Sequence, residues 1–195
     1  MKICGLTREE DAKWAIECGA DALGFIHEPS SPRYIGEEPP KWISGLPILP
    51  MKIAVFGRVT QRVSKTIFDA VQGAEWDNFP EPATKRIHVV QLRPNQSARD
   101  LVSMTINAAA LLLDAYHPQA YGGTGIKVDW DLAAEVVALS SVPVILAGGL
   151  TPENVVEAIQ KVRPFCVDVS SGVEVRPGIK DHQKIMAFIQ AAKGA

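Results

Sequence analysis

Residues 142–173 read VPVILAGGLTPENVVEAIQKVRPFCVDVSSGV and contain a complete strand-helix-strand pattern. Two short apolar runs, 142–147 and 165–169, flank an amphipathic run that predicts a helix over residues 152–162. Both apolar runs are continuous, which is typical of parallel strands buried on both faces. Each run is followed by glycine and hydroxyl residues, so this stretch predicts two parallel strands with candidate ligand-binding turns at their carboxyl ends.

The same alternation extends through the rest of the chain. Five further apolar runs predict strands at residues 2–6, 22–26, 52–56, 87–92 and 110–114. Topology requires one more strand, fourth in chain order, which we place at residues 70–73 although this segment carries little strand signal. Eight alternations in 195 residues predict an α/β fold, a compact (β/α)8 TIM barrel with an atypical fourth strand segment. We expect residues 1–195 to form a single domain.

Helices are predicted between the strands. The first should begin with Thr7 as N-cap and Glu10 as its capping-box partner, and end at Gly19. Others are expected near residues 40–45, 61–68, 130–139 and 181–192. An open doubly wound sheet is the alternative architecture, but the first strand-to-helix turn, residues 4–7, lacks the G-x-G-x-x-G fingerprint that favours it.

Composition narrows the classes of partner. Twenty basic and twenty-two acidic residues give a net charge of −2, so no general field attracts nucleic acid or an anionic membrane, and a phosphate ligand would need a local site. Neither a secretory signal nor a membrane-spanning run is present, and we expect a cytoplasmic protein. The three cysteines are odd in number and far apart, which favours free thiols. The histidines are scattered, and no metal-ligand spacing is seen.

Two late turns are candidates for phosphate binding. Gly148 and Gly149 follow the strand at 142–147, and Thr151 and Pro152 open the next helix, where backbone N–H groups could hold an anion. The turn after the last strand, residues 168–174, carries two hydroxyls and a glycine. Taken singly, each is more often an ordinary tight turn. Their occurrence after consecutive late strands of a barrel favours a phosphate grip.

Three side chains are candidates for chemistry. Cys4 ends the first strand, two residues after Lys2, so both point to the same side and Lys2 could favour the thiolate. The alternatives are a buried cysteine that acts as a small hydrophobe and a Lys2 that only pairs with Asp168. Asp114 ends a strongly apolar strand, where it is either a functional carboxylate or a cap or loop anchor. Arg33 follows the second strand, where a guanidinium suits a carboxylate or phosphate unless it is merely solvated.

These segments together resemble the phosphoribosylanthranilate isomerase family, barrel enzymes that catalyse an Amadori rearrangement in tryptophan biosynthesis. The resemblance covers nearly the whole chain. It is carried by KICGLT at residues 2–7, GADALGF at 19–25, SPRYI at 31–35, LLD at 112–114, YGGTG at 121–125, AGGL at 147–150 and DVSSGVE at 168–174.

The resemblance implies a role for each candidate. Cys4 falls on the general base of the family and Asp114 on its general acid. Substrate binding falls to Arg33, at the anthranilate carboxylate, and to Asp168. Phosphate binding falls to a set of four small residues, namely Gly148, Gly149, Ser171 and Gly172. It implies a small phosphorylated substrate, no cofactor, and a monomer or homodimer. The glycine-rich run at 121–125 is expected to close over the ligand.

One region departs from the family. A Gln-Leu-His-Gly stretch normally ends the fourth strand, whereas this chain has only Val71-Gln72-Gly73 there. Three alternatives therefore stay open. They are an isomerase of a related aminated sugar phosphate of the histidine-pathway type, a non-catalytic barrel that binds a phosphometabolite or a protein, and a redox sensor built on Cys4.

Overall fold

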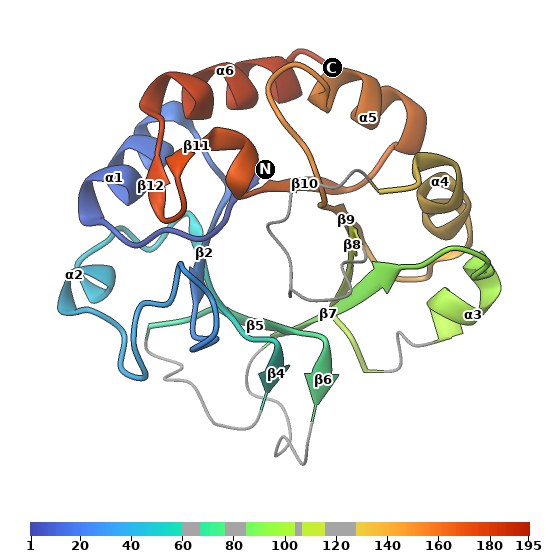
Figure 1. Ribbon diagram of the computed structural model, residues 1–195, viewed down its shortest axis with the longest axis horizontal. Helices are drawn as coiled ribbons and strands as arrows, with labels where there is room; N and C mark the ends of the chain where they lie inside the picture. The colour runs from blue at the N-terminus through green and yellow to red at the C-terminus, as the bar shows by residue number, and fades with distance from the viewer. Residues whose placement is uncertain (60–66, 77–84, 104–106, 116–127) are drawn as a thin grey trace.

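Eight parallel strands close into a barrel (Figure 1) in the order β1-β10-β9-β8-β7-β5-β3-β2. The computed structural model describes residues 1–59, 67–76, 85–103, 107–115 and 128–195. The barrel strands are β1 (Lys2–Ile3), β2 (Ala22–Ile26), β3 (Met51–Val55), β5 (Ala70–Gly73), β7 (Lys85–Leu92), β8 (Ala110–Ala115), β9 (Val144–Leu146) and β10 (Cys166–Val169). The predicted (β/α)8 barrel is confirmed, although some strand ends differ from the predicted ones by one to three residues.

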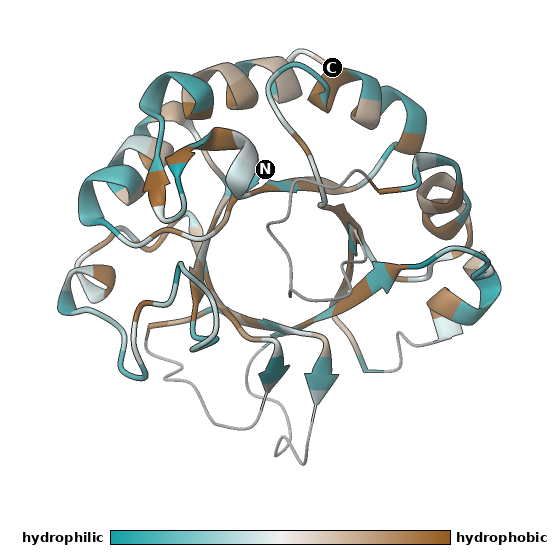
Figure 2. Ribbon diagram, viewed as in Figure 1, coloured by the Kyte–Doolittle hydropathy of each residue, from teal (hydrophilic) through white to brown (hydrophobic). Residues whose placement is uncertain are grey.

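Helices cover the outside of this barrel. They are α1 (Glu9–Cys18), α2 (Lys41–Ser44), α3 (Ala98–Ser103), α4 (Trp130–Leu139), α5 (Val155–Val162) and α6 (His182–Lys193). Figure 2 shows hydrophilic residues on the outward helical surfaces and hydrophobic ones along the barrel strands. Within the described segments, none of these helices has the length and apolar character needed to cross a bilayer.

Two small sheets lie outside the barrel. β4 (Arg58–Val59) pairs in parallel with β6 (Glu75–Trp76), and β11 (Glu174–Arg176) pairs antiparallel with β12 (Ile179–Lys180). A short 3-10 helix, η1 (Ser171–Val173), joins β10 to β11. None of these elements was predicted, because pairs of two or three residues leave no periodic pattern to detect.

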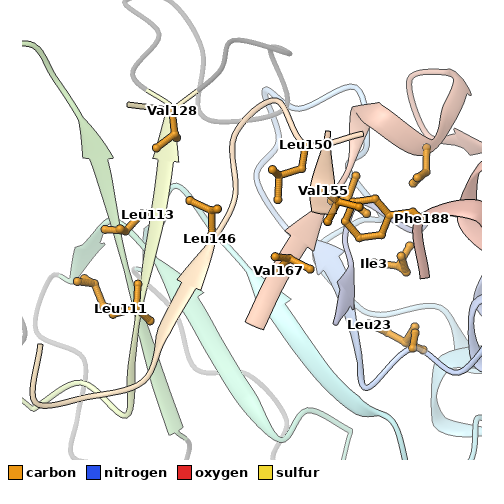
Figure 3. Close-up of a cluster of buried hydrophobic side chains, with 14 of the residues drawn as sticks. Ile3, Leu23, Leu111, Leu113, Val128, Leu146, Leu150, Val155, Val167 and Phe188 are labelled. Atoms are coloured by element: carbon orange, nitrogen blue, oxygen red, sulfur yellow. The ribbon is translucent and has the colours of Figure 1, made fainter. Parts of the chain in front are cut away.

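Alternation along the strands creates two apolar layers. Leu111 and Leu113 of β8 point outward and pack with Leu146 and Val167 under the helices (Figure 3). Leu112 lies between them in sequence and faces the barrel interior, where it joins a second cluster with residues such as Ile53 and Ile145. Side chains two apart on a strand share a face. Asp114 therefore shares the inward face with Leu112, at the carboxyl end of β8.

The fourth strand lies where topology required it, at Ala70–Gly73. All of its residues are buried, and it pairs with β3 on one side and β7 on the other. Its sequence, AVQG, carries little strand signal because only Val has a high strand propensity. The segment forms a strand because its backbone pairs with both neighbouring strands. The segment between β5 and β7 contains β6 at its start, and residues 77–84 lie outside the described part of the chain.

The predicted start of the first helix is wrong. α1 begins at Glu9 after Arg8, which provides no side-chain cap, and Thr7 lies outside the helix. The Thr7 hydroxyl donates instead to the Gly178 carbonyl, 2.5 Å away in the turn between β11 and β12. A distant acceptor has replaced the local cap. The predicted end at Gly19 is confirmed, with a left-handed φ of 90°.

The predicted start of α5 is also wrong. The helix begins at Val155 rather than at Pro152, because residues 152–154 form a turn. Asn154 stabilises this turn: its Oδ1 accepts from the Thr151 amide at 2.8 Å and its Nδ2 donates to the Gly149 carbonyl at 2.9 Å. The expected helix at 61–68 falls almost wholly outside the described residues, as does the run at 121–125.

Asp11 ties the beginning of the chain to its end. This carboxylate on α1 is fully buried and accepts from the Arg8 guanidinium at 2.7 and 2.9 Å. It also accepts from the Lys180 backbone amide at 3.2 Å and contacts His182 Nε2 at 2.9 Å. The first helix is therefore fixed to β12 and α6 through one side chain.

Asp11→Ala is expected to lower the free energy of unfolding by about 2 kcal/mol, because the buried Lys180 amide and the partly exposed Arg8 and His182 side chains lose their acceptor together. Denaturant titration measures this. Asp21→Ala is the matched control: Asp21 is 71% exposed and pairs only with the N-terminal amine, so its loss should cost less than about 1 kcal/mol. Equal losses in the two variants would contradict the proposed tie.

Candidate active site

A pocket opens at the carboxyl ends of the barrel strands. Residues from nearly every barrel strand or its following loop line it, including Cys4, Arg33, Gln72, Asp114, Gly148, Gly149, Asp168 and Ser171. This is where parallel barrels place their ligands, because the strand-to-helix loops gather there. The pocket brings together every predicted site residue except Gly172, which follows the lining residue Ser171 but does not line the pocket itself.

Cys4 enters the pocket beside a buried ion pair. The register of β1 with β10 sets Lys2 next to Asp168, and the Lys2 Nζ donates to Asp168 Oδ2 at 2.7 Å. The same ammonium donates to Gln72 Oε1 at 2.9 Å. Burial would lower the pKa of Lys2, but the charges of Asp168 and Cys4 and the hydrogen bond to Asp168 together outweigh it and raise that pKa. Lys2 is therefore a fixed cation inside the barrel.

The Cys4 thiol is almost fully buried. Burial raises its pKa above the ordinary value, while the positive charge of Lys2 acts in the opposite direction. Asp168 adds to the rise, and Lys180 acts against it. The thiol is thus a weak acid whose ionisation depends on the charges around it.

Asp114 faces the same pocket from β8. Its Oδ1 accepts from the Ala115 amide at 2.8 Å. Desolvation raises the pKa of this carboxyl to about 6, which the Ala115 hydrogen bond opposes only in part. A carboxyl with such a pKa can carry a proton near neutral pH, as a general acid must. Cys4 and Asp114 belong to strands that are not neighbours in the barrel, so they line different walls of one pocket.

Arg33 is held by a buried carboxylate. Its Nε and Nη2 donate to the two oxygens of Glu174 at 2.9 and 2.7 Å. Glu174 also accepts from Lys180 Nζ at 2.9 Å. Burial would raise the pKa of Glu174, but Arg33 and Lys180 outweigh this and lower it. Two cations around one anion leave a net positive charge, and Arg33 reaches the pocket wall.

The two glycine-rich turns are joined by a close backbone contact. A Cβ on Gly172 would lie 1.9 Å from the Leu150 carbonyl oxygen, so only glycine fits there. Gly148 and Gly149 adopt φ values of 79° and 68°, which glycine reaches without strain. Their amides donate to no other residue in the described part of the chain. Ser171 stands beside them on the pocket wall.

Sequence reasoning missed three polar residues here, Gln72, Glu174 and Lys180. Gln72 and Glu174 lay within segments already singled out, and only their contacts give them a role. Two buried polar atoms in the pocket wall, Asp168 Oδ1 and Ser170 Oγ, have no hydrogen-bond partner within the segments that the structure describes. Unpaired buried polar groups are costly, which favours a polar ligand. Among the described residues, no three His, Cys, Asp or Glu side chains are grouped as metal ligands.

The family described as N-(5'phosphoribosyl)anthranilate (PRA) isomerase matches residues 1–191. The chain belongs to the PRA isomerase family. The resemblance inferred from the sequence motifs is therefore confirmed.

Relatives within the PRA isomerase family match along their whole length. N-(5'-phosphoribosyl)anthranilate isomerase of Geobacter sulfurreducens is 43% identical, over 100% of this chain and 98% of that protein. The crystal structure of the Thermotoga maritima isomerase has 38% identity and a TM-score of 0.82, covering 100% and 98%. Another solved isomerase, in complex with reduced 1-(o-carboxyphenylamino)-1-deoxyribulose 5-phosphate, has 36% identity and a TM-score of 0.78 over 100% and 98%.

Gly172→Ala is expected to push the Leu150 backbone away and lower the free energy of unfolding by about 1–3 kcal/mol. If the two turns bind phosphate, inorganic phosphate should also become a weaker competitive inhibitor of substrate turnover. Denaturant titration and phosphate inhibition measure the two effects. Gly194→Ala is the matched control, because a Cβ there meets no atom closer than 3.6 Å and its φ is −90°. Unchanged phosphate inhibition in a destabilised Gly172→Ala protein would separate this glycine from phosphate binding.

Proposed function

We propose that this chain catalyses the Amadori rearrangement of N-(5′-phosphoribosyl)anthranilate to 1-(2-carboxyphenylamino)-1-deoxyribulose 5-phosphate, an isomerase reaction of tryptophan biosynthesis. Asp114 is the general acid and Cys4 the general base. The observation that carries this assignment is the shared pocket: a raised-pKa carboxyl and a thiol beside a fixed cation line different walls of it. The choice of substrate rests on membership of the PRA isomerase family.

Asp114 begins the reaction. Its proton passes to the ribose ring oxygen as the bond from that oxygen to C1′ breaks, and the nitrogen lone pair forms the C1′ iminium. The desolvated wall of the pocket suits this step, because it favours the neutral carboxyl before transfer. The positive iminium then acts as the electron sink for the next step, so the substrate provides its own activation.

Cys4 completes the rearrangement. As a thiolate it takes the proton from C2′, and the electrons of that C–H bond form the C1′–C2′ double bond while the iminium is neutralised. The resulting enolamine tautomerises, losing its hydroxyl proton and gaining one at C1′, to give the ketone. A thiolate rather than a thiol is the base here.

Substrate binding is divided around the pocket. Arg33 binds the anthranilate carboxylate, for which the net positive charge of the Arg33–Glu174–Lys180 group is suited. Asp168 Oδ1, for which the described residues offer no partner, accepts from a ribose hydroxyl. Gly148, Gly149 and Ser171 bind the phosphate, with Gly172 holding their two turns together.

All of these residues come from one chain, so the same pocket serves a monomer or a homodimer. A solved Thermotoga maritima relative, 34% identical over 100% of this chain and 98% of its own, is described as monomers of a dimeric isomerase. We place the reaction in the cytoplasm, with a small phosphorylated molecule as the partner of the site.

Cys4→Ala and Asp114→Asn should each lower kcat by at least about 10²-fold, because each removes a proton-transfer group. Turnover of phosphoribosylanthranilate by purified protein measures this, with the histidine-pathway aminated sugar phosphate as a second substrate. Cys18→Ala, a matched loss of a thiol at the end of α1, should keep normal turnover. Rescue of a tryptophan auxotroph that lacks the isomerase tests the function itself.

Asp114→Asn has a second readout that shows whether the variant is folded. Because the pKa of the Asp114 carboxyl is raised in the folded state, the neutral carboxyl favours folding. This contribution to stability is fully present below the unfolded pKa near 4 and is lost as pH rises through about 6, so the ionised carboxyl costs stability at pH 7. Removing the charge should therefore raise the free energy of unfolding at pH 7 by about 1–3 kcal/mol. Near-normal turnover in both variants would remove the roles given to Cys4 and Asp114.

The pH dependence follows from the two directions of shift. Protonated Asp114 declines tenfold per pH unit above about 6, while the Cys4 thiolate rises tenfold per unit below its own higher pKa. These changes cancel between the two values, so kcat/KM should be flat there and fall on both sides. Because the substrate phosphate also titrates near 6, carbon-13 NMR of the Asp114 carboxyl is the decisive measurement. A midpoint near 4 would contradict the prediction.

A further inference from the structure

Lys2 occupies a position that no step of the reaction uses directly. It is 1% exposed and its Nζ is fixed by Asp168 at 2.7 Å and Gln72 at 2.9 Å. An ammonium has three N–H donors. Two are taken by these oxygens. The positive charge of the ammonium acts on the Cys4 thiol, where it opposes the rise in pKa that burial causes.

Gly24 on β2 provides the space for this arrangement. A Cβ at that position would lie 2.7 Å from Cys4 Sγ and 3.1 Å from Lys2 Cε. The sulfur and the lysine stem therefore lie together against the bare backbone of β2. Any side chain there would move one or both of them.

The charges around Cys4 define what Lys2 does. Asp168 opposes a second negative charge at the sulfur, and Lys180 on β12 favours it from further along the chain. Asp114 faces the same pocket from β8, and the Arg33–Glu174 pair stands at its rim. Lys2 has the larger of the two positive effects on the thiol, and its stem lies with the sulfur against Gly24, so its removal would leave only Lys180 to oppose Asp168.

We propose that Lys2 is a positioning residue that stabilises the Cys4 thiolate, with Asp168 and Gln72 fixing its ammonium and Gly24 seating the sulfur against it. This rests on the proposed role of Cys4 as general base. Lys2 contacts no substrate atom in this scheme and acts only through the thiol. The buried pair with Asp168 is then more than a structural ion pair, since it holds a cation where the base must ionise.

The test measures the thiol directly. In Lys2→Met, the pH midpoint for alkylation of Cys4 by iodoacetamide, followed on the Cys4 peptide by mass spectrometry, should rise by at least about one pH unit. The alkaline limb of kcat/KM should move up in parallel, and kcat should fall at least tenfold while KM changes little. A merely structural lysine would move neither the midpoint nor the limb.

Two further variants keep the test decisive. Lys2→Met with Asp168→Asn removes both charges, so it should fold even if the single variant does not, and its midpoint should lie between those of the single variant and the natural protein. Lys52→Met is the matched control: Lys52 is also a buried lysine, but its ammonium is bound by the Pro47 and Ile48 carbonyls. Its Cys4 midpoint should not change.

The outcomes separate this inference from the function. An unchanged alkylation midpoint in folded Lys2→Met protein overturns the role of Lys2, even if Cys4→Ala is inactive. Full activity of Cys4→Ala overturns the general base, whatever the midpoint shows. A midpoint that rises equally in Lys52→Met would trace the effect to the loss of any buried lysine and overturn the proposal.

Discussion

A buried charge pair in the middle of the barrel is the constraint around which this molecule is arranged. An ammonium and a carboxylate removed from water cost more free energy than their attraction returns unless further hydrogen bonds satisfy them. Lys2 meets this condition through Gln72, which projects from the fourth strand, whereas Asp168 Oδ1 has no partner among the described residues. The weakest strand in the sequence therefore supplies a neutral oxygen that a buried cation needs. The hydrogen bond from Lys2 to Gln72 thus helps to hold AVQG in the barrel although its strand propensity is low.

A second buried charge group, formed by Arg33, Glu174 and Lys180, has two cations for one anion. Glu174 accepts from Arg33, Lys180 and the Gly178 amide, so one anion organises two cations and a turn. Burial lowers the pKa of Lys180 while Glu174 counteracts it. The Arg33–Glu174–Lys180 group is thus net positive, whereas the Lys2–Asp168 pair is neutral. A net positive group of this kind attracts an anionic ligand.

The parts that sequence predicted well were those with local signals. The strand at 22–26 and the helix at 130–139 were predicted to the residue, because a continuous apolar run and a 3.6-residue pattern are read within one element. The site residues were grouped by a rule of architecture, since strand ends in a barrel converge. What failed was local capping, as with Thr7, whose hydroxyl found an acceptor 171 positions away. The partner of Arg33 lies 141 positions away and leaves no local trace either.

The contact between Lys2 and Asp168 joins residues separated by 166 positions. β1 also pairs with β10 on one side, and α1 is fixed to the segment before α6. A ribosome releases the first strand long before the strand that neutralises its lysine. Lys2 and Cys4 therefore lack their neighbours on β10 until that strand has been synthesised, and the pocket forms only when the barrel closes.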